Sequence, residues 1–208
     1  MARPPLDRLP RLLGLDRSGP PPPQTLAGQP LRPWTVPNAI GFVRLALIPV
    51  FLIVAFSSSG GTGTGPAVLF AVIAGGDYAD GIAARLTGQY SRLGTLMDPV
   101  TDRLLMISGV VVCWRFELLP RWALVVLAGR ELSMLALGRY AQTHGVQLRI
   151  NWPGRVGVGL LMGAFFFALA GLETLGEALL YGGLVLALGA TGLYARAGLL
   201  QLRDVARP

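Results

Sequence analysis

Six apolar stretches follow one another from Trp34 onward, and each is close to the length that crosses a bilayer as a helix. A hydrocarbon core about 30 Å thick needs about 20 helical residues. A backbone in lipid must satisfy its own hydrogen bonds, so each stretch is predicted to be helical. The sequence therefore predicts an all-α integral membrane protein with six transmembrane helices, at about 38–56, 66–86, 92–116, 120–140, 154–172 and 178–199.

The composition supports a membrane protein and argues against a nucleic-acid partner. Of the 208 residues, 52% are hydrophobic and 14% are charged, whereas soluble domains carry about 25% charged residues. The net charge is +7. All the basic residues are Arg, and most lie near the ends of the apolar stretches. Topology and anionic lipid headgroups explain that placement better than nucleic acid does.

The chain divides into three zones. Residues 1–33 are rich in Pro and Arg and are predicted to be a disordered cytoplasmic tail. Residues 34–200 form the predicted six-helix transmembrane domain, and residues 201–208 a short C-terminal tail. Six spans leave both termini on one side of the membrane. The Arg bias of the tails and of the links at 86–92 and 141–153 predicts that this side is the cytoplasm.

Four carboxylates lie within 26 residues of this apolar chain: Asp77, Asp80, Asp98 and Asp102. A charged side chain at membrane depth costs at least roughly 2.5–3.5 kcal/mol, so the cluster needs a compensating charge. Residues three or four apart share one face of a helix, and the link through Gly88 returns the chain antiparallel. The two pairs are therefore expected to face each other. Divalent cations prefer oxygen ligands and offset the repulsion between carboxylates.

The residues beside the carboxylates suit a phosphate-bearing ligand. Gly81 and Ala84 carry little side-chain bulk, and Arg85 follows one turn later, where it could meet a phosphate oxygen. Two alternatives remain open at this point. The carboxylates could form a buried ion-pair network with an Arg such as Arg85, Arg92 or Arg103. They could also form the path of a divalent-cation transporter, although spans five and six have no Asp or Glu in their interiors.

The stretch DYADGIAARLTGQYSRLGTLMDPVTD resembles the signature of the CDP-alcohol phosphatidyltransferase family. It matches the pattern D-x2-D-G-x2-A-R-x8-G-x3-D-x3-D at every fixed position. The preceding TVPNAIGFVRLALIPVF is similar to the first helix of bacterial phosphatidylglycerophosphate and cardiolipin synthases of this family. The resemblance implies the CDP-alcohol phosphotransferase fold, a homodimer, two divalent cations (Mg²⁺ or Mn²⁺) and a polar cavity on the cytoplasmic side of a bacterial plasma membrane.

The resemblance also implies roles for the motif residues. Asp77, Asp80 and Asp98 would be metal ligands, and Asp102 would be the general base and a further ligand. The CDP pocket would be shaped by Gly81, Ala84, Arg85 and Gly94. Two residues of the first span are further candidates. Asn38 is expected either to contact CDP or to cap the helix. Arg44 is either functional or the ion-pair partner of a motif carboxylate.

The implied reaction transfers a phosphatidyl group from CDP-diacylglycerol to an acceptor hydroxyl and releases CMP. A glycerol-type acceptor is predicted, either glycerol 3-phosphate or phosphatidylglycerol, with an inositol phosphate as the alternative. Arg130 and Arg155 are the predicted acceptor-binding residues, Glu131 is expected to pair nearby, and His144 is expected to be incidental. The GRVG at 154–157 departs from the Gly-Lys-x-Lys-Thr element usual in glycerol 3-phosphate enzymes. It therefore carries fewer cations than expected near a phosphate monoester.

Overall fold

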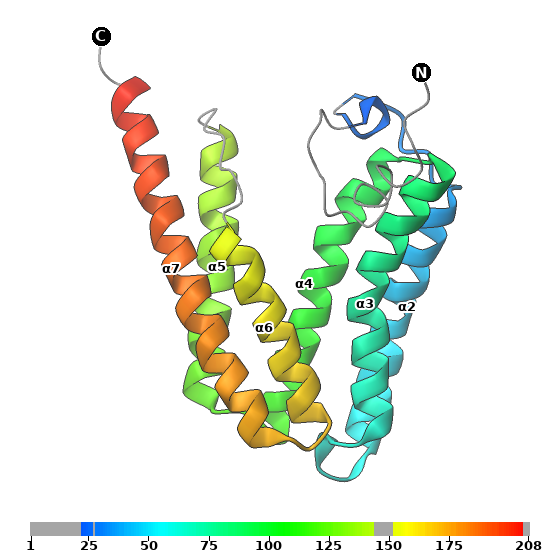
Figure 1. Ribbon diagram of the computed structural model, residues 1–208, viewed down its shortest axis with the longest axis vertical. Coiled ribbons are helices and arrows are strands. Elements are labelled where there is room, and N and C mark those ends of the chain that lie inside the picture. Colours follow the sequence, from blue (N-terminus) through cyan, green and yellow to red (C-terminus); the bar gives the residue numbers. More distant parts are fainter. Residues whose placement is uncertain (1–21, 27, 144–151, 206–208) are drawn as a thin grey trace, which may run out of the picture. The chain divides into compact units, whose positions relative to one another are not determined.

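The computed structural model describes residues 22–26, 28–143 and 152–205, and these residues are all-α. Two short 3-10 helices, η2 (Pro23–Thr25) and η3 (Ser59–Gly61), accompany six long helices. The six helices confirm the prediction in number and in order. They are α2 (Val36–Ser57), α3 (Thr64–Thr87), α4 (Arg92–Arg115), α5 (Arg121–Thr143), α6 (Trp152–Leu169) and α7 (Glu173–Val205) (Figure 1).

Three described segments are long and apolar enough to cross a membrane: Val36–Ser57, Thr64–Thr87 and Glu173–Tyr194. The apolar helix Gly154–Leu169 is shorter. Helices α4 and α5 are long enough but more polar. Helix α4 carries Asp98, Asp102 and Arg103 in its interior, and α5 carries Arg130 and Glu131. Intramembrane charge of this kind marks functional positions rather than lipid-facing ones.

The chain forms two compact units. The first contains residues up to Val54 and Val68–Ser108, and the second contains Ala55–Ala67 and the chain from Gly109 onward. The first unit therefore holds most of α2 and α3 and the N-terminal two thirds of α4. Its core includes Phe51 of α2 and Phe70 of α3, whose rings meet edge to face with centroids 5.6 Å apart.

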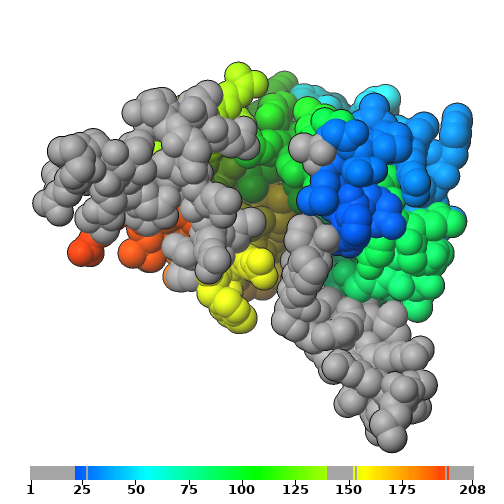
Figure 2. Space-filling model, turned by 90° about the horizontal axis from the view of Figure 1, so that it is seen from above, coloured from blue at the N-terminus to red at the C-terminus, as the bar shows by residue number. Residues whose placement is uncertain are grey.

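Within the first unit, the segment before α2 is hydrogen-bonded to the link between α3 and α4 and to the first residues of α4. The Leu93 amide donates to the Leu31 carbonyl, and Arg92 donates to the Gln29 carbonyl. The Val36 amide donates to the side chain of Gln89. Figure 2 shows this dark-blue segment on the same end of the unit as the green link. Residues 28–33, at the end of the predicted tail, are thus hydrogen-bonded to the helical domain.

In the second unit, α6 and α7 pack through glycines. A Cβ on Gly157 would lie 3.2 Å from the Ala187 amide nitrogen, and one on Gly176 would lie 3.0 Å from the Ala164 carbonyl oxygen. Small residues of this kind let helix backbones approach closely inside a membrane. Helices α5 and α7 are joined by stacking of Trp122 on Tyr181, with ring centroids 5.6 Å apart.

Helix α7 differs from its predicted boundaries at both ends. A link was predicted at 173–177, but Glu173 begins the helix, and α7 continues to Val205 rather than ending near Leu199. Gly171, with φ of 82°, supplies the turn, so three residues suffice to connect α6 and α7. Glu173 in the first turn is favourable at the positive end of the helix dipole. The predicted link at 141–153 lies largely outside the described residues, as does His144.

Candidate active site

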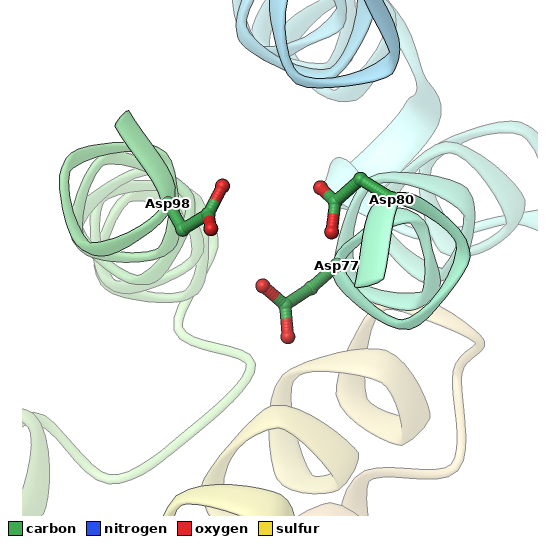
Figure 3. A group of neighbouring side chains, drawn as sticks. All are labelled: Asp77, Asp80 and Asp98. Carbon is green, nitrogen blue, oxygen red and sulfur yellow. The ribbon is translucent and has the colours of Figure 1, made fainter. Parts of the chain in front are cut away.

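Three of the motif carboxylates converge in the first unit. Asp77 and Asp80 lie on α3 and Asp98 lies on α4, and each offers an oxygen within 4.8 Å of the others. Figure 3 shows the two α3 carboxylates directed toward that of Asp98 across the gap between the helices. The expectation that the two pairs face each other is thereby confirmed for these three residues. A set of carboxylate oxygens is the donor set that Mg²⁺ and Mn²⁺ prefer, so the acidic triad fits a hard divalent cation.

The fourth carboxylate, Asp102, is bound by Arg44 of α2. Arg44 Nη2 lies 2.9 Å from Asp102 Oδ1, and Arg44 Nη1 lies 2.9 Å from Asp80 Oδ2. Asp77 Oδ1 is 3.6 Å from the same Nη1. One guanidinium thus contacts carboxylates from both sides of the helix pair. The expectation that Arg44 pairs with a motif carboxylate is confirmed.

Arg44 reaches the carboxylates across the surface of α3. Its Nε donates to the Ile73 carbonyl at 2.9 Å, and the residue is only 2% exposed. A Cβ on Gly76 would lie 2.6 Å from Arg44 Cδ, closer than two carbon atoms can pack. Gly76, one position before the motif, therefore leaves the space that the Arg44 side chain occupies.

A pocket in the same unit adjoins the acidic triad. Asp80 and Asp98 contribute to its wall. Four of the five residues predicted to shape the CDP site also line it: Asn38, Gly81, Ala84 and Gly94. Arg85 is not part of this lining, but its guanidinium lies beside Gly81 of α3. A Cβ added to Gly81 would be 3.4 Å from Arg85 Nη1. The structure therefore brings the small motif residues and two of the carboxylates, Asp80 and Asp98, to one cavity.

Asn38 and Gly94 also have structural roles that were not predicted from the sequence. Asn38 is not the cap of α2, because its own amide donates to the Thr35 hydroxyl, which takes that position. The Asn38 side chain donates to the Arg32 and Pro33 carbonyls and accepts a 2.7 Å hydrogen bond from Ser91. A Cβ on Gly94 would lie 2.9 Å from Asn38 Oδ1. Gly94 thus permits the close contact of α2 with α4.

Several residues of the pocket were not predicted from the sequence. Ser91 precedes α4, and its hydroxyl accepts from the Gly94 amide at 2.9 Å, which is the N-cap pattern. A Ser directly before a predicted helix could have indicated this role. Thr95 also lines the pocket, and its carbonyl cannot receive the usual helical hydrogen bond because residue 99 is Pro. Other pocket residues without a sequence signal are Thr25, Pro37, Gln89 and Tyr90.

The predicted acceptor-binding residues belong to the second unit. Arg130 is ion-paired with Glu131, as expected, and its Nε donates to Thr191 of α7 at 3.2 Å. Arg155 is exposed in the first turn of α6. The guanidinium of Arg130 is therefore partly neutralised within its own unit, whereas Arg155 is accessible.

Comparison with known proteins is decisive for the family. The profile described as CDP-alcohol phosphatidyltransferase matches residues 34–189, which include the triad, the pocket motif and Arg44. The chain belongs to the CDP-alcohol phosphatidyltransferase family. The family resemblance found in the sequence is thereby confirmed.

Relatives within the family carry two kinds of name. A protein of Streptomyces coelicolor named cardiolipin synthase (CMP-forming) is 38% identical over 136 residues, or 63% of each chain. The aligned region thus spans less than two thirds of that relative. The Bacillus subtilis CDP-diacylglycerol–glycerol-3-phosphate 3-phosphatidyltransferase is 27% identical over 59% of this chain and 70% of its own. A Shigella flexneri protein of the same name is 28% identical over 82% of this chain and 98% of its own.

Proposed function

We propose that this protein is a membrane phosphatidyltransferase of phospholipid synthesis. It transfers a phosphatidyl group from CDP-diacylglycerol to the hydroxyl of a glycerol-type acceptor and releases CMP. The observation that carries the proposal is the shared cavity, in which Gly81, Ala84 and Gly94 lie beside the carboxylates of Asp80 and Asp98. A ligand with a narrow, phosphate-bearing headgroup would contact small residues and the proposed cation-binding carboxylates in the same pocket. Membership of the family supports the same reaction.

The acidic triad is the proposed cation site. Asp77, Asp80 and Asp98 would hold Mg²⁺ or Mn²⁺, with Asp102 completing a site for two cations. Bound cations would neutralise the diphosphate of the donor and favour the build-up of negative charge at phosphorus. Arg85, beside Gly81, would add a fixed positive charge for a phosphate oxygen.

The reaction requires one displacement and one proton transfer. The acceptor oxygen forms a bond to the phosphorus that carries the diacylglycerol, the bond from that phosphorus to the bridging oxygen breaks, and CMP leaves with the electron pair. The hydroxyl proton moves to Asp102, the proposed general base. Only one oxygen of Asp102, Oδ1, is bound by Arg44, so Oδ2 is the oxygen proposed to take the proton.

Three observations favour phosphatidylglycerol over glycerol 3-phosphate as the acceptor. The Streptomyces relative is named cardiolipin synthase and shares more identity than the two relatives named for glycerol 3-phosphate. The 154–157 segment, GRVG, carries one cation rather than two or more. Arg130 is already paired with Glu131. A phosphatidylglycerol acceptor presents no phosphate monoester and needs fewer cations. Arg155 is then the exposed cation proposed to meet its phosphodiester.

The wider setting is proposed with the same reaction. Residues 34–200 would be the catalytic domain in a bacterial plasma membrane, with the pocket and both termini facing the cytoplasm, where CDP-lipids are used. The placement of Arg at the predicted inner links supports this orientation. A homodimer is proposed from the family resemblance.

The test is CMP release by purified protein. CDP-diacylglycerol and Mn²⁺ or Mg²⁺ are supplied with phosphatidylglycerol, glycerol 3-phosphate or an inositol phosphate in separate reactions. We expect CMP with phosphatidylglycerol and none after chelation of the cation with EDTA. Asp102→Asn should lower turnover at least about 1,000-fold while the protein still binds CDP-diacylglycerol. No CMP with any acceptor would refute the proposal, and CMP only with glycerol 3-phosphate would refute the choice of acceptor.

Gly81 offers a second test of the pocket. A Cβ there would meet only the Arg85 guanidinium, at 3.4 Å, so the packing of the protein tolerates it. If the glycine makes room for the donor, Gly81→Ala should leave the thermal unfolding temperature unchanged or higher and raise KM for CDP-diacylglycerol about tenfold or more. An unchanged KM would place the donor elsewhere.

A further inference from the structure

Arg44 links α2, α3 and α4 at the carboxylate cluster of the first unit. It projects from α2, contacts Asp77 and Asp80 of α3, and contacts Asp102 of α4. Its side chain is 3% exposed, whereas those of Asp77 and Asp102 are 51% and 46% exposed. The buried Arg44 guanidinium therefore contacts the carboxylate cluster from one side. The exposed carboxylates of Asp77 and Asp102 remain accessible from the other side.

The three nitrogens of the guanidinium each have a partner. Nε donates to the Ile73 carbonyl, Nη1 to Asp80 and Nη2 to Asp102, all at 2.9 Å. A planar guanidinium with three such bonds has little freedom to rotate, and it fixes the positions of the two carboxylate oxygens that it binds. A Lys ammonium is a single point charge and cannot reproduce this arrangement.

The positive charge of Arg44 also affects how the cluster binds cations. One guanidinium offsets only one of the four clustered carboxylates, so the cluster remains strongly anionic and can still attract divalent cations. At the same time, a fixed positive charge in contact with Asp77 and Asp80 repels a cation bound by the same residues. Arg44 should therefore weaken the intrinsic affinity of the triad for cations while ordering the site.

We propose that Arg44 is a positioning residue with two separable effects. It orients Asp102, through Oδ1, for proton transfer at Oδ2, and as a permanent cation it lowers the affinity of the acidic triad for divalent cations. The first effect rests on the proposed phosphatidyl transfer. The second concerns cation binding alone and does not depend on which reaction the protein catalyses.

The two effects predict opposite changes when the charge is removed. In Arg44→Gln, Mn²⁺ should bind about tenfold more tightly, because the repulsion is gone. Turnover should fall at least about 100-fold, because Asp102 is no longer held in place. A residue needed only for folding would lower cation affinity and turnover together. The tighter binding is therefore the signature that a structural role does not produce.

The experiment measures Mn²⁺ binding without substrates and turnover with them. Free Mn²⁺ is followed by electron paramagnetic resonance in titrations of detergent-purified wild-type, Arg44→Gln and Arg44→Lys proteins. Arg44→Lys keeps the charge but not the fork, so Mn²⁺ affinity should stay within about threefold of wild type while kcat falls at least about tenfold. Arg121→Gln is the matched control, since Arg121 pairs with Glu117 in an exposed contact. It should change neither quantity.

The following results would distinguish a positioning role of Arg44 from a purely structural one. Weaker Mn²⁺ binding in Arg44→Gln, or a wild-type kcat in Arg44→Lys, would overturn the proposal. If Arg44→Gln does not fold, the Lys variant still decides, because only a positioning role separates its kcat from its Mn²⁺ affinity. If the wild-type protein releases no CMP but Arg44→Gln binds Mn²⁺ more tightly, the proposed function has failed while the charge effect of Arg44 stands.

Discussion

Gly76 provides the space through which Arg44 reaches the carboxylates. A Cβ at this position would lie 2.6 Å from Arg44 Cδ and 2.8 Å from Arg44 Cγ. Gly76→Ala should therefore displace the guanidinium from Asp80 and Asp102. We expect a loss of about 1–3 kcal/mol in unfolding free energy from the forced contact, and a drop in CMP release. Thermal unfolding in detergent and the turnover assay measure the two effects.

Gly75 is the matched control for this prediction. It is the preceding residue of the same helix, and a Cβ there would meet nothing within 4 Å. Gly75→Ala should stabilise α3 by up to about 1 kcal/mol through helix propensity and leave turnover unchanged. Equal behaviour of the two variants would show that the contact with Arg44 does not govern this site.

The same residues show what the sequence could predict of the site. The four Asp and the small motif residues were identifiable because their spacing fixes which of them share a helix face. The residue that forms ion pairs with the carboxylates was harder to predict. Arg44, 58 positions from Asp102, was one candidate beside Arg85, Arg92 and Arg103, and it forms ion pairs with Asp80 and Asp102. Helix packing decides that pairing, and it depends on the absence of a side chain at Gly76.

The start of α4 depends on one hydroxyl. Ser91 accepts a hydrogen bond from the Gly94 amide and donates one to Asn38 Oδ1 of α2. Ser91→Ala removes the cap and leaves the buried Asn38 oxygen without this donor. It should lower the unfolding free energy by about 1–3 kcal/mol, the sum of a lost cap and a lost buried hydrogen bond. Ser91→Thr keeps the hydroxyl and should cost less than half as much; equal losses in chemical or thermal unfolding would contradict the capping role.

Contact between α6 and α7 gives a second prediction for the helices. A Cβ on Gly183 would lie 2.9 Å from Leu161 Cγ and 3.1 Å from the Leu161 amide nitrogen. Gly183→Ala should therefore push the helices apart and cost about 1–3 kcal/mol. Gly189, on the same helix, would meet nothing within 4 Å, so Gly189→Ala should be neutral or stabilising. Thermal unfolding of the pair measures the difference, and a stable Gly183→Ala would argue against this packing.

Helix number and order were predictable because each stretch is close to the length of a transmembrane helix, even where, as in α4 and α5, it carries charged residues. The ends of α7 were not. The acidic residues at 173–177 suggested a link, but Glu173 suits the first turn of a helix, and a single left-handed glycine made the turn shorter. Apolar periodicity cannot distinguish a polar helix end from a polar link.

For the whole molecule, the sequence predicts that both termini and the link between α3 and α4 face the cytoplasm. The loop at 58–63, before α3, carries no charge, whereas Arg85 and Arg92 flank the link after it. Arg-rich connections stay on the cytoplasmic side of bacterial membranes. Helix α3 has 24 residues, enough for about 36 Å, so its two ends should lie on opposite sides.

Cysteine labelling can test this orientation on one helix. The single native Cys113 is buried, so a Cys113→Ala background gives no signal of its own. In that background, Ser59→Cys places an exposed thiol before α3, and Thr87→Cys places one at the C-terminal end of α3. A membrane-impermeant maleimide added to intact spheroplasts should label Ser59→Cys and not Thr87→Cys. Both should be labelled after detergent treatment, which controls for reactivity. Labelling of Thr87→Cys alone in intact spheroplasts would invert the topology and place the carboxylates of α3 and α4 in the outer half of the membrane, away from a cytoplasmic supply of CDP-lipid.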